Sequence, residues 1–261
     1  MRIVAAVEYS GVGFHGWQLQ PGSGTVQAVV EEALSRVADH PVRVHCAGRT
    51  DAGVHALWQV IHFDTPAVRE PRSWVLGANV HLPRRVALLW ARRIREDFHA
   101  RFSAVSRSYR YVILNRATRP GVLSGRVTWE RRPLSDEAMH AAGQALVGTH
   151  DFSAFRALGC QARSPVRTLS RLEVSRNGDI VELEVTANAF LHHMVRNIAG
   201  VLLAIGTGDR AVSWAREVLE HRDRTRGGVT ARPDGLYFAG VRYPGVYGLP
   251  VADCGPTVPF T

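Results

Sequence analysis

The stretch VRVHCAGRTDAGVHALWQVIHFDT, residues 42–65, contains two apolar runs separated by a short polar turn. Residues 42–47 alternate between apolar and polar side chains, and residues 57–65 are rich in β-branched and aromatic side chains, as strands are. The turn between them carries one carboxylate, Asp51. Because an aspartate in a turn often hydrogen-bonds its own backbone, Asp51 is either a turn-former or a functional group. The stretch therefore predicts two consecutive strands and leaves the role of Asp51 open.

Periodic patterns on both sides of this stretch extend it to the order β-α-β-β-α-β. Residues 2–9 are typical of a strand, and residues 25–38 repeat apolar side chains at helical spacing after Thr25, a favourable N-cap. A helix is expected from Pro71 through residue 80, because proline is common in the first turn of helices. Residues 86–94 then predict another strand.

The second half of the chain repeats the same order of elements. The patterns predict strands at 106–115, 166–175, 179–187 and 235–243, and helices at 135–148, 190–208 and near 211–220. Asn177-Gly178, between two of the strands, indicates a hairpin. We therefore expect an α+β fold of two tandem ferredoxin-like, split β-α-β halves, residues 1–100 and 101–261. Their antiparallel or mixed sheets are expected to meet in one body, with a central cleft between the halves.

The charge of the chain points to a polyanionic partner. The formal net charge is +9, and all 32 basic residues are arginine. Without lysine the chain has neither a Schiff-base lysine nor a P-loop lysine. Residues 92–132 hold eleven arginines and three acidic residues, a net charge of +8 from eleven minus three. Such a one-sided excess favours nucleic-acid binding that weakens with salt.

Several other classes of protein are disfavoured. No apolar run reaches 18 residues and the N-terminal stretch does not resemble a signal peptide, so we expect no membrane span and a cytoplasmic protein. The three cysteines, Cys46, Cys160 and Cys254, are widely spaced, which favours reduced thiols. Residues 11–16, GVGFHG, match a dinucleotide-binding fingerprint, but no helix follows directly and no acidic residue stands at the required position. We expect a loop at a binding face and no nucleotide cofactor.

No metal site is predicted. His192 and His193 are adjacent, and on a helix they would point about 100° apart, so they could not share one ion. The chain contains neither H-E-x-x-H nor C-x-x-C. One of the two histidines is expected in the core and the other on the surface.

The run GRTDAGVHALWQVIHF, residues 48–63, resembles the catalytic motif of the tRNA pseudouridine synthase A (TruA) family. Four further blocks resemble other blocks of the family in the same order: FHARFSAVSRSYRY (98–111), GTHDFSAFRALGCQARSPVRT (148–168), ANAFLHHMVRNIAG (187–200) and DGLYF (234–238). Residues 9–27 resemble the start of the family's sequences as well. The resemblance implies a cytoplasmic isomerase that converts uridine to pseudouridine in the anticodon stem-loop of tRNA, around positions 38–40. It also implies that no cofactor is needed and that one tRNA contacts both subunits of a homodimer.

The resemblance also implies roles for five residues. Asp51 corresponds to the catalytic aspartate, Arg49 pairs with it and occupies the gap left by the flipped base, and Arg196 pairs with Asp51 as well. Tyr109 stacks on the target base, and Leu236 lines the uracil pocket. The alternatives for Asp51, attack at C1′, attack at C6 or removal of the C2′ proton, stay open, as does an acid or base role for Tyr109. Relatives carry lysines on the RNA-binding face, where this chain has arginine.

The alternative function from another class is a non-catalytic tRNA-binding or tRNA-folding module. It explains the basic residues and the aromatic positions. It leaves Asp51 unexplained, because an isolated carboxylate facing polyphosphate repels RNA. We therefore favour the enzyme.

Overall fold

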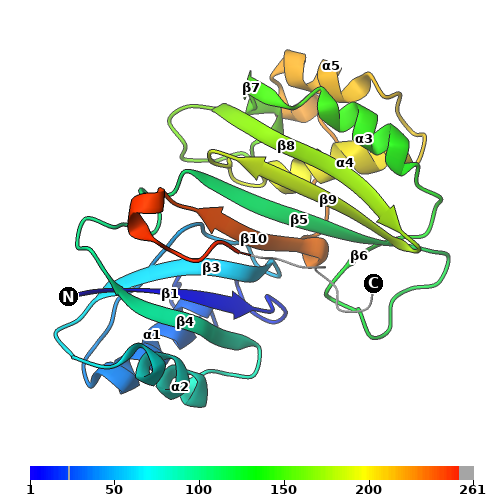
Figure 1. Ribbon diagram of the computed structural model, residues 1–261. Coiled ribbons are helices and arrows are strands. Elements are labelled where there is room, and N and C mark those ends of the chain that lie inside the picture. Colours follow the sequence, from blue (N-terminus) through cyan, green and yellow to red (C-terminus); the bar gives the residue numbers. More distant parts are fainter. Residues whose placement is uncertain (23, 253–261) are drawn as a thin grey trace. The chain divides into compact units, whose positions relative to one another are not determined.

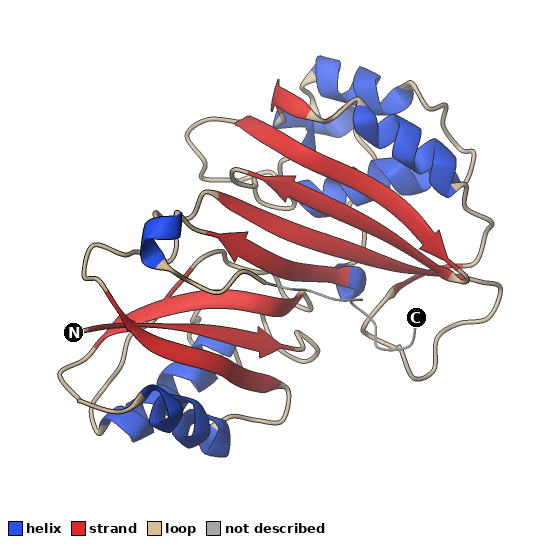
Figure 2. Cartoon of the chain, in the orientation of Figure 1, coloured by secondary structure: helices blue, strands red, loops and turns tan. Residues whose placement is uncertain are grey.

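The computed structural model describes residues 1–22 and 24–252 of the chain. The fold is α+β, and its described part contains ten β-strands, five α-helices and short 3₁₀ turns (Figures 1 and 2). The contacts divide it into two compact units, residues 1–105 with 237–252, and residues 106–236. No helix in the described residues is long and apolar enough to cross a membrane.

The first unit has the predicted order of strands and helices. Its elements are β1 (Arg2–Tyr9), α1 (Val26–Ala38), β2 (His45–Cys46), β3 (His55–Asp64), α2 (Pro71–His81) and β4 (Val86–Ile94). β1 is the central strand and pairs antiparallel with β3 and β4, so that Ala5 lies between Ile61 and Ala91. α1 and α2 lie together on one side of this sheet (Figure 1), where Trp74 packs edge-on against Phe63. The Thr25 hydroxyl caps α1, as predicted.

The edge of β3 is shared by two strands. The strand predicted at 42–47 is reduced to β2, which pairs only through His45–His62 and Cys46–Ile61. The reason is local: the backbone amides of Val42 and Val44 donate to the side chains of Ser35 and Glu31 on α1. Further along β3, the last strand, β10 (Leu236–Arg242), pairs in parallel at His55 and Ala56.

The second unit contains a sheet with the strand order β5-β9-β8-β7 and three helices. Its elements are β5 (Ser106–Asn115), β6 (Thr128–Glu130), α3 (Asp136–Gln144), β7 (Gly148–Asp151), β8 (Val166–Asn177), β9 (Ile180–Ala187), α4 (Met194–Gly206) and α5 (Trp214–His221). The neighbouring strands are antiparallel, and the predicted hairpin turns at Asn177-Gly178, with Gly178 at φ 56°. β6 pairs in parallel with β5. The periodicity missed β6 and β7, which are only three and four residues long.

Helix α4 begins later than predicted. The pattern predicted a helix over 190–208, but His193 has φ 62°, in the left-handed region, so the helix begins at Met194. His192 and His193 therefore precede the helix, and their rings contact each other at 4.0 Å between centroids. The expectation that they point in different directions from one helix is wrong. So is the expected core histidine, since His192 is exposed and His193 is half-buried.

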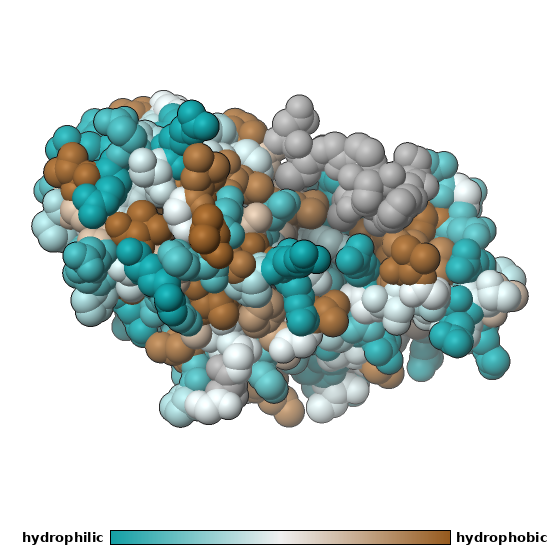
Figure 3. Space-filling view, turned by 90° about the horizontal axis from the view of Figure 1, so that it is seen from below, coloured by the Kyte–Doolittle hydropathy of each residue, from teal (hydrophilic) through white to brown (hydrophobic). Residues whose placement is uncertain are grey.

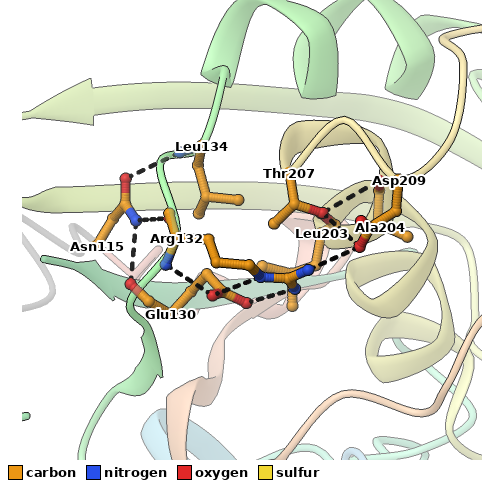
Figure 4. A network of polar contacts seen from close by, with 8 residues as sticks. All are labelled: Asn115, Glu130, Arg132, Leu134, Leu203, Ala204, Thr207 and Asp209. Carbon is orange, nitrogen blue, oxygen red and sulfur yellow. Dashed lines mark hydrogen bonds and ion pairs between the residues drawn. The ribbon is translucent and has the colours of Figure 1, made fainter. Parts of the chain in front are cut away.

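A polar network anchors the C-terminal end of α4 (Figure 4). Arg132 donates to both carboxylate oxygens of Glu130 and to Asp209, which also accepts a hydrogen bond from Thr207, the C-cap of α4. The hydrogen bonds from Arg132 hold the pKa of Glu130 below its usual value. Because Arg132 and Asp209 are about half exposed, the network contributes modestly to stability but ties β6 to α4.

The surface is a mixture of polar and apolar residues. Figure 3 shows one face, on which hydrophobic residues occur in small groups between hydrophilic ones. Apolar residues are ordinarily found on the surface of globular proteins. This face alone does not identify a binding surface, and the candidate site has to be located from individual residues.

Candidate active site

The turn that carries Asp51 is stabilised through its backbone. The amide of Val54 donates to the Asp51 carbonyl at 3.1 Å, and Gly53 takes φ 79°, a left-handed conformation that glycine adopts without strain. The hydroxyl of the preceding residue, Thr50, lies 2.8 Å from the Tyr9 hydroxyl in the core, and the carbonyl of Thr50 accepts from Trp17. Asp51 itself is half-buried. The backbone around Asp51 is therefore held at a fixed position.

The glycines of residues 11–16 contact this turn. A Cβ on Gly16 would lie 2.7 Å from the Thr50 carbonyl oxygen, and one on Gly11 would collide with the Val54 carbonyl. Only glycine permits two backbones to approach so closely. The loop therefore supports the Asp51 turn, which explains why GVGFHG resembles a nucleotide-binding fingerprint without being followed by a helix.

A buried glutamine fixes the other side of the turn. Gln59 on β3 is fully buried; its amide nitrogen donates to the Gly48 carbonyl at 2.5 Å, and its oxygen accepts from the amides of Ala47 and Gly48. Arg49 follows directly and is exposed. The backbone of Arg49 is thus fixed by its neighbour Gly48, whereas the Arg49 side chain is exposed.

Cys46, at the start of this stretch, is not suited to act as a nucleophile. Burial raises the pKa of its thiol to about 12, against the opposing effects of the positive charges of Arg49 and Arg101. It is therefore protonated at neutral pH, and the reactive form of cysteine is the thiolate. Cys46 and Cys160 are free thiols, as predicted, and Cys254 lies outside the described residues.

His55 is a site-supporting residue that the sequence analysis did not select. It is buried at the start of β3, its Nδ1 accepts from the Gly11 amide at 3.0 Å, and its ring stacks on Tyr237 of β10 at 4.6 Å. His55 thus joins the glycine loop, β3 and β10. Its position four residues after Asp51, directly before the apolar residues 56–58, is the signal that could have identified it.

The second unit carries two tyrosines on β5 with different environments. Tyr111 is fully buried, and its hydroxyl lies 2.6 Å from the Thr128 hydroxyl and donates to the Arg232 carbonyl at 2.9 Å. Burial raises the pKa of Tyr111 although the positive charge of Arg196 opposes the shift. Tyr109, in contrast, is half-buried and meets Phe190 edge-on at 4.9 Å. Tyr111 therefore has a structural role, and Tyr109 is the tyrosine of β5 whose side chain is partly accessible to a ligand.

Arg196 lies in the first turn of α4. Its Nε donates to the Ala231 carbonyl at 2.8 Å, and the Ala231 amide donates back to the Arg196 carbonyl at 3.1 Å. One turn later, a Cβ on Gly200 would collide with the carbonyl of Val229, so residues 228–231 lie directly on the helix. These contacts fix both the backbone and the guanidinium of Arg196.

Leu236, the fifth predicted residue, is buried at the start of β10. The preceding Gly235 packs against β5, where an added Cβ would collide with the Val112 carbonyl. The predicted site residues are thus divided: Arg49 and Asp51 belong to the first unit, and Tyr109, Arg196 and Leu236 belong to the second. Within the second unit, Tyr111 donates to the Arg232 carbonyl and Arg196 donates to the carbonyl of the adjacent Ala231, so the start of α4 lies near β5.

The positive charge of the arginine-rich segment 92–132 is more fully compensated in the structure than its sequence suggests. Within the described residues, several of its arginines form ion pairs with carboxylates: Arg95 with Asp97, Arg110 with Glu182 and Glu184, Arg116 with Asp179, and Arg132 with Glu130 and Asp209. Five others, Arg93, Arg101, Arg119, Arg126 and Arg131, are exposed. The segment is also divided between the two units at residue 105. Only part of its charge is therefore available to a polyanion.

Comparison with known proteins agrees with the motifs. The protein family described as tRNA pseudouridine synthase matches residues 5–103 and 142–244. The tRNA pseudouridine synthase A of Nitrosococcus oceani is 58% identical over 250 residues, 96% of either chain. That of Methylococcus capsulatus is 58% identical over 95% of this chain and 92% of its own, and that of Coxiella burnetii is 52% identical over 98% of both. Among solved structures, a chain of a Cbf5-Nop10-Gar1 complex aligns over 77% of this chain and 54% of its own, with 11% identity and a TM-score of 0.33.

Proposed function

This chain belongs to the tRNA pseudouridine synthase A family, and on that premise we propose that it isomerises uridine in the anticodon stem-loop of tRNA, around positions 38–40, with Asp51 as its catalytic residue. One observation carries the proposal: the matched segments contain both the GRTD run with Asp51 and the HHMVRN run with Arg196. The chain is accordingly an isomerase that acts on tRNA.

The reaction exchanges one glycosidic bond for another. The N1–C1′ bond breaks, the uracil rotates, and a C5–C1′ bond forms while the proton on C5 is lost. Because the target base is stacked within the stem-loop, it must first leave the stack, at a cost of a few kcal/mol. An ionised Asp51 then attacks C1′ or C6, or removes the C2′ proton. The rigid backbone of residues 50–54 supports this role, because a positioned group loses little entropy on reacting.

The other predicted residues have roles in binding. Tyr109 stacks on the flipped base, which recovers about 1–3 kcal/mol, and Leu236 forms an apolar wall of the uracil pocket. Arg196 pairs with Asp51 and offsets the cost of a buried carboxylate charge where water is excluded. Arg49 pairs with the same carboxylate and occupies the space that the flipped base leaves. The exposure of Arg49 supports the last role, since its side chain is free to enter an RNA helix.

The proposal extends to the assembly. Residues 1–100 supply Asp51 and residues 101–261 complete the active site, in one body with a central RNA-binding cleft. The enzyme works in the cytoplasm without a cofactor, as a homodimer in which one tRNA contacts both subunits. Size-exclusion chromatography with light scattering, with and without tRNA, measures this stoichiometry.

Tritium release from tRNA labelled at C5 of uridine tests the activity. The wild type should release tritium, and Asp51→Asn should lose activity by on the order of 10³-fold or more while it binds tRNA with unchanged affinity. Asp39→Asn, an exposed aspartate beyond the end of α1, is the matched control and should keep full activity. Equal release by the wild type and Asp51→Asn would assign the chemistry to another residue. Tight tRNA binding without release by the wild type would leave a tRNA-binding module.

A further inference from the structure

The second unit contains a cavity of about 340 Å³ that none of the five predicted site residues lines. It lies between the segment after β7 and the segment after α5, elements found at the same end of the unit in Figure 1. Three arginines, Arg156, Arg222 and Arg224, line it together with Ser153 and residues 157–159. Three guanidinium groups around one cavity are unusual unless an anion binds among them.

The positive charge of this pocket, which we name the three-arginine pocket, is only partly compensated. The nearest ion pair joins Arg222 Nε to the Asp151 carboxylate at 3.9 Å, a long contact. Although burial acts to raise it, hydrogen bonds from Ser153 and the charges of Arg222 and Arg156 hold the pKa of Asp151 below its usual value. Asp151 therefore offsets one of the three positive charges at neutral pH.

The backbone of Arg222 is strained in a way that supports a functional role. Arg222 is the C-cap of α5 and has φ 53°, a left-handed conformation that is normally occupied by glycine or asparagine. Residues in sparsely populated conformations cluster at active sites and at segments that hold ligands. In this position the Arg222 side chain lines the pocket and remains 67% exposed.

Arg224, in contrast, is fixed. Its guanidinium donates to the Gly228 carbonyl at 2.9 Å, to the Asn197 side chain at 3.1 Å and to the Thr230 hydroxyl at 2.9 Å. These three acceptors are neutral, so they hold the group in place without cancelling its charge. Arg224 thus provides a rigid positive wall, and Arg156 and Arg222 complete the pocket.

The pocket is connected to the start of α4, which carries Arg196. Asn197, which accepts from Arg224, is the next residue on the helix and also donates to the Phe155 carbonyl at 2.7 Å. From the other wall of the pocket, the Ala157 amide donates to the His192 carbonyl at 2.9 Å. Both walls are therefore hydrogen-bonded to residues within four positions of Arg196.

We propose that the three-arginine pocket binds a backbone phosphate of the RNA substrate and thereby positions the RNA relative to the start of α4. A volume of 340 Å³ accommodates a phosphate with its ribose. Leu158, which lines the pocket and is 90% exposed, offers the sugar or base an apolar contact. The inference rests on the proposed function for the identity of the ligand, and its test separates the two.

The test compares two double variants of the full-length protein. Arg156→Gln/Arg222→Gln removes two charges from the pocket, and Arg171→Gln/Arg216→Gln removes two exposed charges elsewhere in the second unit, of which Arg171 is already paired with Glu173 and Glu184. The affinity for a labelled tRNA transcript is measured by fluorescence anisotropy from low to high salt. The pocket variant should bind roughly tenfold more weakly, and the slope of log affinity against log salt should fall by about one for each arginine. The control should keep at least most of its affinity.

Turnover separates this inference from the proposed function. The pocket variant should raise KM and keep kcat within about twofold at saturating tRNA, since Asp51 is untouched. If the wild type forms no pseudouridine, the proposed function fails, whereas the salt slopes still test the pocket. If the wild type is active but the pocket variant binds like the control, the pocket inference fails alone. Stabilisation by inorganic phosphate that the pocket variant loses, with tRNA binding unchanged, would assign the pocket to a free phosphate and overturn the RNA assignment.

Discussion

The Asp51 turn of the first unit and the start of α4 in the second unit are held in similar ways by different chemistry. In both, a glycine permits two backbones to touch: Gly16 lies against Thr50, and Gly200 lies against Val229. The backbone of the Asp51 turn is then fixed by neutral groups, such as the Gln59 amide. At the start of α4 the fixed groups are guanidiniums: Arg224 donates to Asn197 of the helix, and Arg196 of the helix donates to the Ala231 carbonyl.

This difference separates two requirements of an enzyme that acts on RNA. A carboxylate that does chemistry needs a precise position, which short hydrogen bonds from buried neutral groups provide. A surface that holds RNA needs positive charge, which arginines provide at long range. We therefore expect changes near Asp51 to act on kcat and on stability, and changes around α4 to act on tRNA binding as well.

The largest effect that would test this contrast is expected for Arg196→Lys. Lysine keeps the charge but cannot reproduce the fixed donor that Arg196 Nε provides to the Ala231 carbonyl. We expect kcat to fall by about 10²-fold, with a melting temperature close to that of the wild type. Tritium release under single-turnover conditions measures the loss.

Arg216→Lys, on an exposed position of α5, is the control and should be fully active. If Arg196→Lys kept wild-type kcat, positive charge alone would suffice at this position. The contrast between a positioned group and a charged surface would then lose its basis.

In the first unit, Gln59→Leu should be the most damaging single change to stability. Leucine has a similar volume but leaves the Gly48 carbonyl and the amides of Ala47 and Gly48 without the side-chain partners that Gln59 provides. We expect a loss of about 2–4 kcal/mol in the free energy of unfolding, and a lower kcat because Arg49 and Asp51 follow this anchor. Urea denaturation and single-turnover kinetics measure the two effects.

Gln144→Leu is the control in the second unit. Gln144 is exposed and makes one hydrogen bond, to the Leu172 carbonyl. Its replacement should cost less than about 1 kcal/mol. A similar cost for both variants would mean that the Asp51 turn does not depend on its buried amide.

The two glycine contacts should be similarly sensitive to an added methyl group. In Gly16→Ala the added methyl group would collide with the Thr50 carbonyl, and alanine would have to adopt a left-handed φ of 86°. In Gly200→Ala the methyl group would collide with the Val229 carbonyl, although alanine favours the helix. We expect each to destabilise the protein by about 1–3 kcal/mol. Thermal unfolding checks this, with Gly24→Ala as the control, because a Cβ there meets open space.

The two glycine variants should differ in function. Gly16→Ala should lower kcat with tRNA affinity unchanged, whereas Gly200→Ala should also weaken tRNA binding, because residues 228–231 lie between α4 and Arg224. The same pattern in both variants would remove the distinction between the two regions.

The smallest effect concerns acid sensitivity. Burial, with the positive charges of His99, Arg2 and His45 around it, lowers the pKa of His62 in the first unit to about 3, although Asp64 opposes the shift. In the unfolded chain a histidine titrates near pH 6.5. The contribution of neutral His62 is therefore fully present above about pH 6.5 and is lost as pH falls from there towards 3. His62→Asn, which keeps an acceptor for the Ala100 amide, should flatten the decline in melting temperature between pH 7 and 5.

The second unit should respond in a lower pH range. The depressed pKa values of Glu130 and Asp209 provide stability above about pH 4 that is lost as these groups become protonated. The melting temperature of Arg132→Gln should therefore be lower than that of the wild type at pH 7, and the two should converge at low pH.

His81→Gln is the control for His62→Asn in the range from pH 7 to 5. His81 is exposed, so its replacement should not alter the pH profile of the melting temperature. Equal slopes for His62→Asn and the wild type between pH 7 and 5 would contradict the assignment to His62.

The sequence predicted long, regular elements and contiguous motifs well. β1, α1, α2, β4, β5 and the β8–β9 hairpin lie where periodicity and turn residues placed them, because these signals are local. The family that the motifs predicted was confirmed by comparison with known proteins. Short strands were missed, since β6 and β7 contain too few residues to show a period. The start of α4 was misplaced because nothing in the pattern marks the left-handed conformation of His193.

By itself, the sequence determined the α+β order of elements, the family and the position of Asp51, because each of these depends on residues that are close together in the chain. Only the tertiary structure decided that GVGFHG supports the Asp51 turn, that Tyr111 rather than Tyr109 is buried, and that Arg156, Arg222 and Arg224 line one pocket. These features depend on backbones that meet although tens of residues separate them. Which distant carbonyl a glycine touches, or which arginines converge, is set by packing and leaves no periodic signal in the sequence.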